Sequence, residues 1–85
     1  MSTATERADT IQRLLNDEVV QDVLADMKQD AYTDFLRATN DDQRRAAHAF
    51  AQGIARLETA FQAVVDAGER ERMDAESADR RLATR

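Results

Sequence analysis

Residues 47–64, AHAFAQGIARLETAFQAV, carry the most regular apolar pattern in the chain. Apolar side chains recur there at alternating intervals of three and four residues for nearly three heptads. This spacing predicts an α-helix with one apolar strip that packs against another helix. We expect the strip to be the seam through which the protein self-associates, and its residues are Ala47, Phe50, Ile54, Leu57, Phe61 and Val64.

The residues on either side of this stretch set the predicted helix ends. Asn40 or Thr39, followed by Asp41 and Asp42, is typical of a helix N-terminus, because a short polar side chain accepts hydrogen bonds from the free amides and acids favour the positive end of the helix dipole. Gly68 fits the position just after a helix C-terminus. The predicted helix covers residues 41–67 and would be roughly 40 Å long.

Two further helices are expected before it. Apolar residues at helical spacing predict a first helix over residues 6–15, and Asn16 before Asp17 predicts a break and a new N-terminus. The second helix then covers residues 17–38. Because few residues separate it from the third helix, we expect an antiparallel helical hairpin. The predicted fold is all-α, with a coiled-coil-like seam on the last long helix.

The second helix repeats with a period of four residues. An acid stands at every fourth position, and apolar residues follow in two ridges beside the acids. Since a helix turns every 3.6 residues, each ridge drifts by about 40° per step, so its two ends should contact different neighbours. We expect the acidic ridge to face solvent, although it would also suit a basic partner. Its residues are Glu18, Asp22, Asp26, Asp30 and Asp34.

A charged C-terminal tail, residues 69–85, is predicted to follow a helical domain of residues 1–68. Met73 and Leu82 are its only large apolar side chains, so we expect it to fray or to dock on a partner. Arginines in the tail and at the start of the third helix are candidate basic contacts for nucleic acid. They are interleaved with acids, which disfavours such binding because phosphate affinity needs a net positive patch. These arginines are Arg44, Arg45, Arg80, Arg81 and Arg85.

The composition excludes several kinds of site. The 85 residues contain no Cys and a single His, His48, so neither a disulfide nor a Cys/His zinc site can stabilise this small domain. Self-association is the remaining source of additional stability. No residue at supporting spacing would make His48 catalytic, and no phosphate loop or EF-hand is present, so we predict no enzyme activity, cofactor or metal. Without a signal peptide or an apolar stretch of about 18–20 residues, a cytoplasmic protein without membrane contact is expected.

Four features together resemble a group of small helical proteins of tailed phages and prophages. They are RLLND at residues 13–17, the aromatic residues Tyr32 and Phe35, NDD at residues 40–42 and VVDAG at residues 64–68. The resemblance implies an accessory or particle-assembly protein that acts in the bacterial host cytoplasm or in the virion. It implies no catalytic residue.

We therefore expect a non-enzymatic, homo-oligomeric protein-interaction module that takes part in virion assembly, with a virion or packaging component as a further partner. Two alternatives stay open. One is an acidic inhibitor or nucleic-acid mimic that places the acidic ridge in the basic groove of a partner protein. The other is a DNA-packaging accessory that binds DNA through its arginines.

Overall fold

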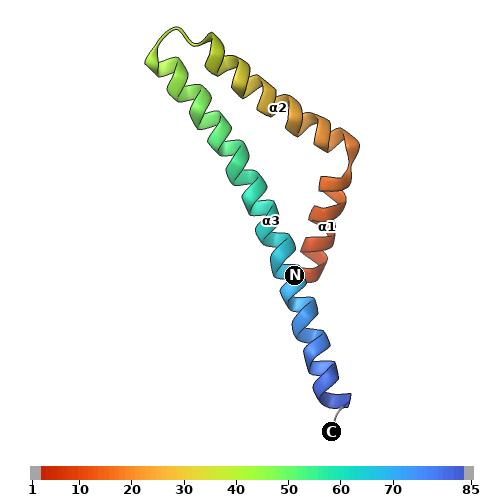
Figure 1. Ribbon diagram of the computed structural model, residues 1–85. Helices are drawn as coiled ribbons and strands as arrows, with labels where there is room; N and C mark the ends of the chain where they lie inside the picture. The colour runs from red at the N-terminus through yellow and green to blue at the C-terminus, as the bar shows by residue number, and fades with distance from the viewer. Residues whose placement is uncertain (1–2, 84–85) are drawn as a thin grey trace.

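Three α-helices make up residues 3–83, the part of the chain that the computed structural model describes, and this part contains no strand. The helices are α1 (Ala4–Asn16), α2 (Glu18–Arg37) and α3 (Asp41–Ala83). The predicted all-α class is confirmed. In Figure 1, α1 and α2 form two sides of a triangle, α3 closes it, and the rest of α3 projects beyond α1. The molecule is elongated, with extents of 69 × 25 × 22 Å.

The predicted break between the first two helices is present, but its cap is Asp17 rather than Asn16. Asn16 is the last residue of α1. The Asp17 carboxylate accepts hydrogen bonds from the backbone amides of Val19 (2.8 Å) and Val20 (3.3 Å). Asp and Asn serve equally well at this position, because each offers a short side-chain oxygen to the free amides of the first turn.

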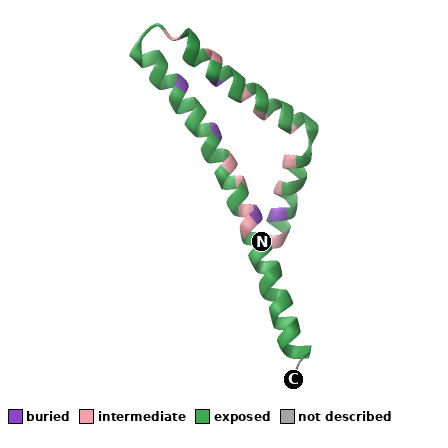
Figure 2. Cartoon of the chain, in the orientation of Figure 1, coloured by how far each residue is buried: buried purple, intermediate pink, exposed green. Residues whose placement is uncertain are grey.

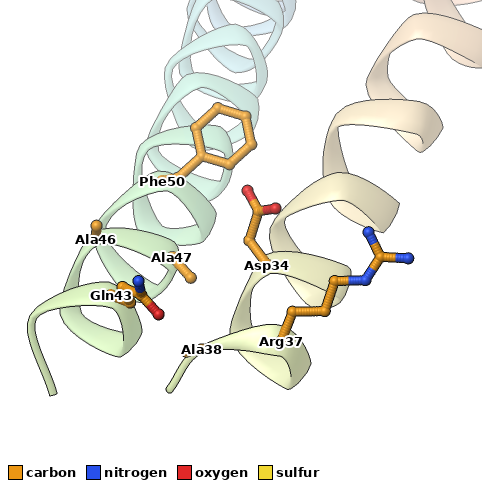
Figure 3. A pocket seen from close by; sticks show the side chains of 7 residues that line it. All are labelled: Asp34, Arg37, Ala38, Gln43, Ala46, Ala47 and Phe50. Carbon is orange, nitrogen blue, oxygen red and sulfur yellow. The ribbon is translucent and has the colours of Figure 1, made fainter. Parts of the chain in front are cut away.

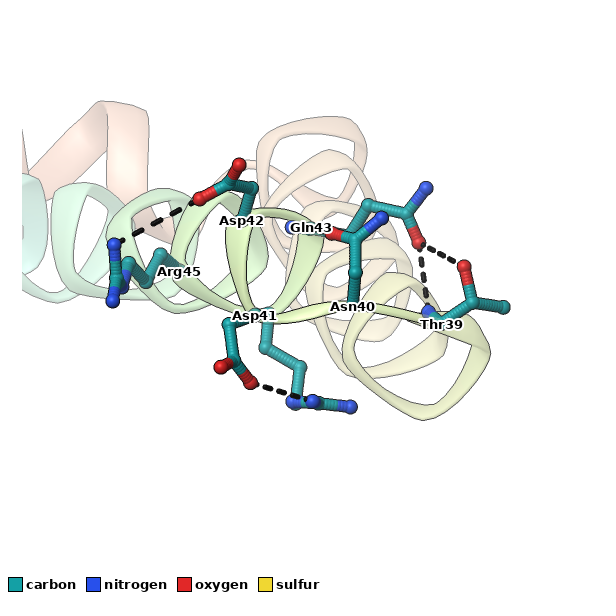
Figure 4. Close-up of polar contacts among 7 residues, drawn as sticks. Thr39, Asn40, Asp41, Asp42, Gln43 and Arg45 are labelled. Atoms are coloured by element: carbon teal, nitrogen blue, oxygen red, sulfur yellow. Dashed lines mark hydrogen bonds and ion pairs between the residues drawn. The ribbon is translucent and has the colours of Figure 1, made fainter.

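Reciprocal side-chain hydrogen bonds fix the turn between α2 and α3 (Figure 4). The Asn40 side-chain oxygen accepts from the backbone amide of Gln43 at 2.8 Å. In return, the Gln43 side-chain oxygen accepts from the backbone amide of Thr39 (2.8 Å) and from its hydroxyl (3.0 Å). These contacts resemble a capping box and confirm the predicted start of the last helix.

The predicted end of that helix at Ala67 is wrong, because α3 continues through Gly68 to Ala83. Gly68 has no left-handed backbone conformation and so does not terminate the helix. It lies instead where α1 crosses α3: a Cβ built on Gly68 would stand 2.2 Å from the Cβ of Ala8 and 3.0 Å from the carbonyl oxygen of Ala4. The division into a helical domain and a tail stays a prediction.

The core is thin and consists mainly of small side chains. Figure 2 shows the buried positions as isolated points along the helices rather than as a continuous layer. No large side chain is fully buried in the described part of the chain. The radius of gyration is 19.1 Å, whereas a compact domain of this length has about 12 Å. The buried apolar residues are Ala8, Ala31, Ala47, Ile54 and Val65.

The two glycines of α3 offer a matched test of the α1–α3 crossing. A Cβ on Gly53 would meet nothing within 4 Å, so Gly53→Ala should raise the free energy of unfolding by up to about 1 kcal/mol through helix propensity. The Gly68→Ala variant gains the same helix propensity, but its new methyl group must displace α1. We therefore expect this variant to be less stable than Gly53→Ala by about 1–3 kcal/mol. Urea unfolding followed by circular dichroism measures both.

A double variant provides the control. Adding Ala8→Gly restores space at the crossing, so it should be less destabilising in the Gly68→Ala protein than in the unmodified protein. Equal effects of alanine at the two glycines would contradict the close approach of α1 and α3.

Candidate interaction surfaces

The predicted self-association seam is divided between two directions around α3. Ala47 and Ile54 are buried, at 5% and 4% exposure, and line one groove together with Ala31 of α2. Phe50 and Leu57 are each 41% exposed. Residues seven positions apart on a helix, such as Ala47 and Ile54, point in nearly the same direction. Phe50 follows Ala47 by three positions and therefore points about 60° to one side. The line of α3 that faces α2 and α1 is Ala47, Ile54, Phe61, Val65 and Gly68, of which Phe61 is half-buried.

The packed side of α2 crosses from one apolar ridge to the other. Val20 and Leu24, from one ridge, and Met27, from the other, are half-buried, and Ala31 of that second ridge is buried. Their spacing of four, three and four residues keeps one direction on the helix, so the ridges, with their four-residue period, drift past this packed side as predicted. Tyr32, by contrast, stays 60% exposed. The ends of both ridges are therefore left in solvent, and they comprise Val19, Val23, Tyr32, Phe35 and Leu36.

Two open grooves run along the α2–α3 contact, one on each side. The larger, about 520 Å³, is bordered by an ion pair between Lys28 and Glu58 at 3.0 Å. His48 also lines it, among apolar neighbours Tyr32, Phe35, Ala51 and Ala55. The smaller groove, about 360 Å³, lies beside the turn, and Figure 3 shows the Phe50 ring and the Asp34 carboxylate between α2 and α3. Both grooves pair an apolar wall with a charged rim, which suits contact with another polypeptide.

A polar contact holds α1 on α3. The Glu71 carboxylate accepts from the backbone amide of Ala4 (3.0 Å) and from the hydroxyl of Thr5 (3.2 Å), and Arg72 lies 3.6 Å from Asp9. A carboxylate at a helix N-terminus is favourable because it satisfies free amides and meets the positive end of the dipole. Glu71 could not be identified from the sequence, since its partners are 66 and 67 residues away and no local pattern marks it.

All five residues of the acidic ridge are exposed. Asp22 and Asp26 point away from the packed side of α2, on which Leu24 and Ala31 lie. Asp34 lines the groove beside Phe50, between α2 and α3 (Figure 3). Within residues 3–83, no group of acidic or histidine side chains is arranged to hold a metal ion.

The candidate basic contacts do not form one patch. Arg44 lies 2.6 Å from Asp41, and Arg45 lies 3.8 Å from Asp42, so both are neutralised on their own helix. Arg80 and Arg81 are exposed near the far end of α3, apart from these two, and Arg85 lies outside the described residues. The pairing at the start of α3 does not favour the DNA-packaging alternative.

Comparison with protein families, with curated proteins and with solved structures finds no match for this chain. Among residues 3–83, no helix is both long and apolar enough to span a bilayer.

Neutralising the acidic ridge should leave the fold intact. Each like-charged pair four residues apart costs a few tenths of a kcal/mol, so the triple variant Asp22→Asn, Asp26→Asn, Asp30→Asn should keep its helix content and melt at a slightly higher temperature. Added salt should stabilise the unmodified protein more than the variant, because salt screens the repulsion. Circular dichroism melts at low and high salt measure this, and loss of helix content would show that the ridge has a structural role.

Proposed function

We propose that the protein is a non-enzymatic, self-associating helical module whose task is to bind other polypeptides. The observation that carries this proposal is the surface area of a single copy. The chain exposes 6902 Å², whereas a compact monomer of 9.6 kDa exposes about 5,100 Å². The excess, about 1,800 Å², is more than twice the roughly 800 Å² that each partner buries in a standard interface.

The exposed area includes many large apolar side chains. A lone copy that leaves them in water forgoes about 25 cal/mol for every Å² of apolar surface that a partner would cover. Their distribution over all three helices favours contact along the length of the molecule rather than at one point. They are Leu14, Val19, Val23, Tyr32, Phe35, Leu36, Phe50, Leu57, Met73 and Leu82.

The sequence supports a more specific arrangement of the copies and a more specific role. We propose that α2 and α3 act as a helical hairpin and that copies meet through coiled-coil packing on α3, where the apolar heptads are longest. The resemblance to small phage proteins supports a role in particle assembly, in the host cytoplasm or the virion, with a structural or packaging protein as the second partner.

The mass of the protein in solution tests self-association. Light scattering after size exclusion, over a wide range of concentration, should give a mass above 9.6 kDa that falls on dilution. Leu57→Glu should shift the protein to the monomer, because a charge would be placed in the interface, whereas Gln52→Glu on the far side of α3 should not. A strict monomer at every concentration, with a cooperative melt, would contradict the proposal.

A second candidate function is supported by the exposure of all five carboxylates on the acidic ridge. Such a row could occupy the basic groove of a partner protein as a nucleic-acid mimic. Under this function, the triple Asn variant should keep the oligomer mass but lose binding to a polyarginine peptide at moderate salt. Under the first function, the same variant should assemble as the unmodified protein does.

A further inference from the structure

A second heptad repeat runs along one flank of α3, beside the lines of contact with α2 and α1. Its positions follow intervals of four and three residues, and small residues alternate with large ones along its whole length. We name it the outer seam. All of its members are exposed except Val64, which is half-buried. Its residues are Ala46, Phe50, Gly53, Leu57, Ala60, Val64 and Ala67.

Gly53 lies near the centre of the outer seam, with open space around it. A Cβ on this residue would contact nothing within 4 Å, so no helix of the same copy explains a glycine here. Phe50 and Leu57, the large residues on either side, are 41% exposed. Small residues between large ones allow a second helix backbone to approach closely while its side chains fill the gaps.

Open grooves border both ends of the outer seam. At one end, Ala46 and Phe50 line the groove of about 360 Å³ beside α2 (Figure 3). At the other, Val64 and Ala67 line a groove of about 230 Å³ beside Ala4 and Arg7 of α1. The seam is thus exposed from Ala46 to Ala60, whereas at its far end Val64 lies half-buried beside α1.

We propose that a second copy of this chain packs antiparallel on the outer seam, centred near Leu57. This inference rests on the self-association proposed above and specifies its surface and direction. The order small–large–small–large–small–large–small reads the same from either end, so an antiparallel pairing about Leu57 keeps the two strips in step along their whole length. Phe50 of one copy then lies near Val64 of the other. The excess exposed surface of each copy is ample for such an interface.

Charge selects the antiparallel direction. Beyond Ala67 the same intervals continue with Glu71, whose carboxylate binds the N-terminus of α1, and with Asp74. In a parallel pair the two Asp74 carboxylates would face each other, which is unfavourable. In the antiparallel pair they lie beside the start of the partner α3, where two arginines balance two aspartates and the helix dipole adds positive charge.

Single cysteines test the pairing cleanly, because the chain contains no native Cys. Ala46→Cys and Ala67→Cys lie on the outer seam at nearly equal distances on either side of Leu57. When the two variants are mixed and oxidised, they should form a disulfide-linked heterodimer, whereas each variant alone should form little linked dimer. The matched control is the pair Gln52→Cys and Gln62→Cys, also on either side of Leu57 but off the seam, which should not cross-link.

Each other outcome overturns the inference in a different way. Homodimeric disulfides from each variant alone would show a parallel pair. Cross-linking of the control pair to the same extent would show that the contact is not confined to the seam. A dimeric mass without any of these links would place the interface elsewhere and leave the proposed function standing. A monomeric mass at every concentration would contradict both the antiparallel pairing and the proposed self-association.

Gly53→Leu provides an independent measurement. A bulky side chain at this small position should raise the dissociation constant of the dimer about tenfold or more, while Gln52→Leu, one residue round the helix, should change it less than about twofold. Circular dichroism checks that both variants keep their helix content. Equal association of Gly53→Leu and the unmodified protein would overturn the proposal.

Discussion

The crossing of α1 and α3 at Ala8 and Gly68 is the constraint on which the arrangement of the helices depends. Without a side chain on Gly68, α1 can lie close enough for Glu71 to reach its first amide and for Arg72 to approach Asp9. Because α2 follows α1 after a single residue, the position of α1 also sets where α2 begins its return toward the turn. Few apolar side chains are buried elsewhere, so this one close approach has a large share in defining the shape.

The starts of α2 and α3 could be predicted to within one residue because their causes are local. The capping side chains at Asp17 and Asn40 lie two or three residues from the amides they satisfy. The end of α3 could not be predicted in the same way. A glycine that stops a helix and a glycine that admits another helix look alike in sequence, and only the distant residue Ala8 distinguishes them.

The candidate surfaces were predictable in part for a similar reason. The heptad of Ala47, Ile54 and Phe61 identifies an apolar direction on α3, but it does not say on which side the intervening large residues fall. That depends on the side from which α2 and α1 approach. Phe50 and Leu57 are left exposed because the neighbouring helices contact the line that continues to Val65 and Gly68.

The projecting end of α3 has a thermodynamic character of its own. From Met73 to Ala83 every residue is exposed, and an isolated helix of that length would scarcely form in water, since starting a helix is unfavourable. Here the body of the molecule has already supplied the starting turns, so each further turn needs only propagation. On warming, the projecting end of α3 should therefore lose its helical turns gradually, starting from the C-terminal turn, while the rest of the protein unfolds as one cooperative unit.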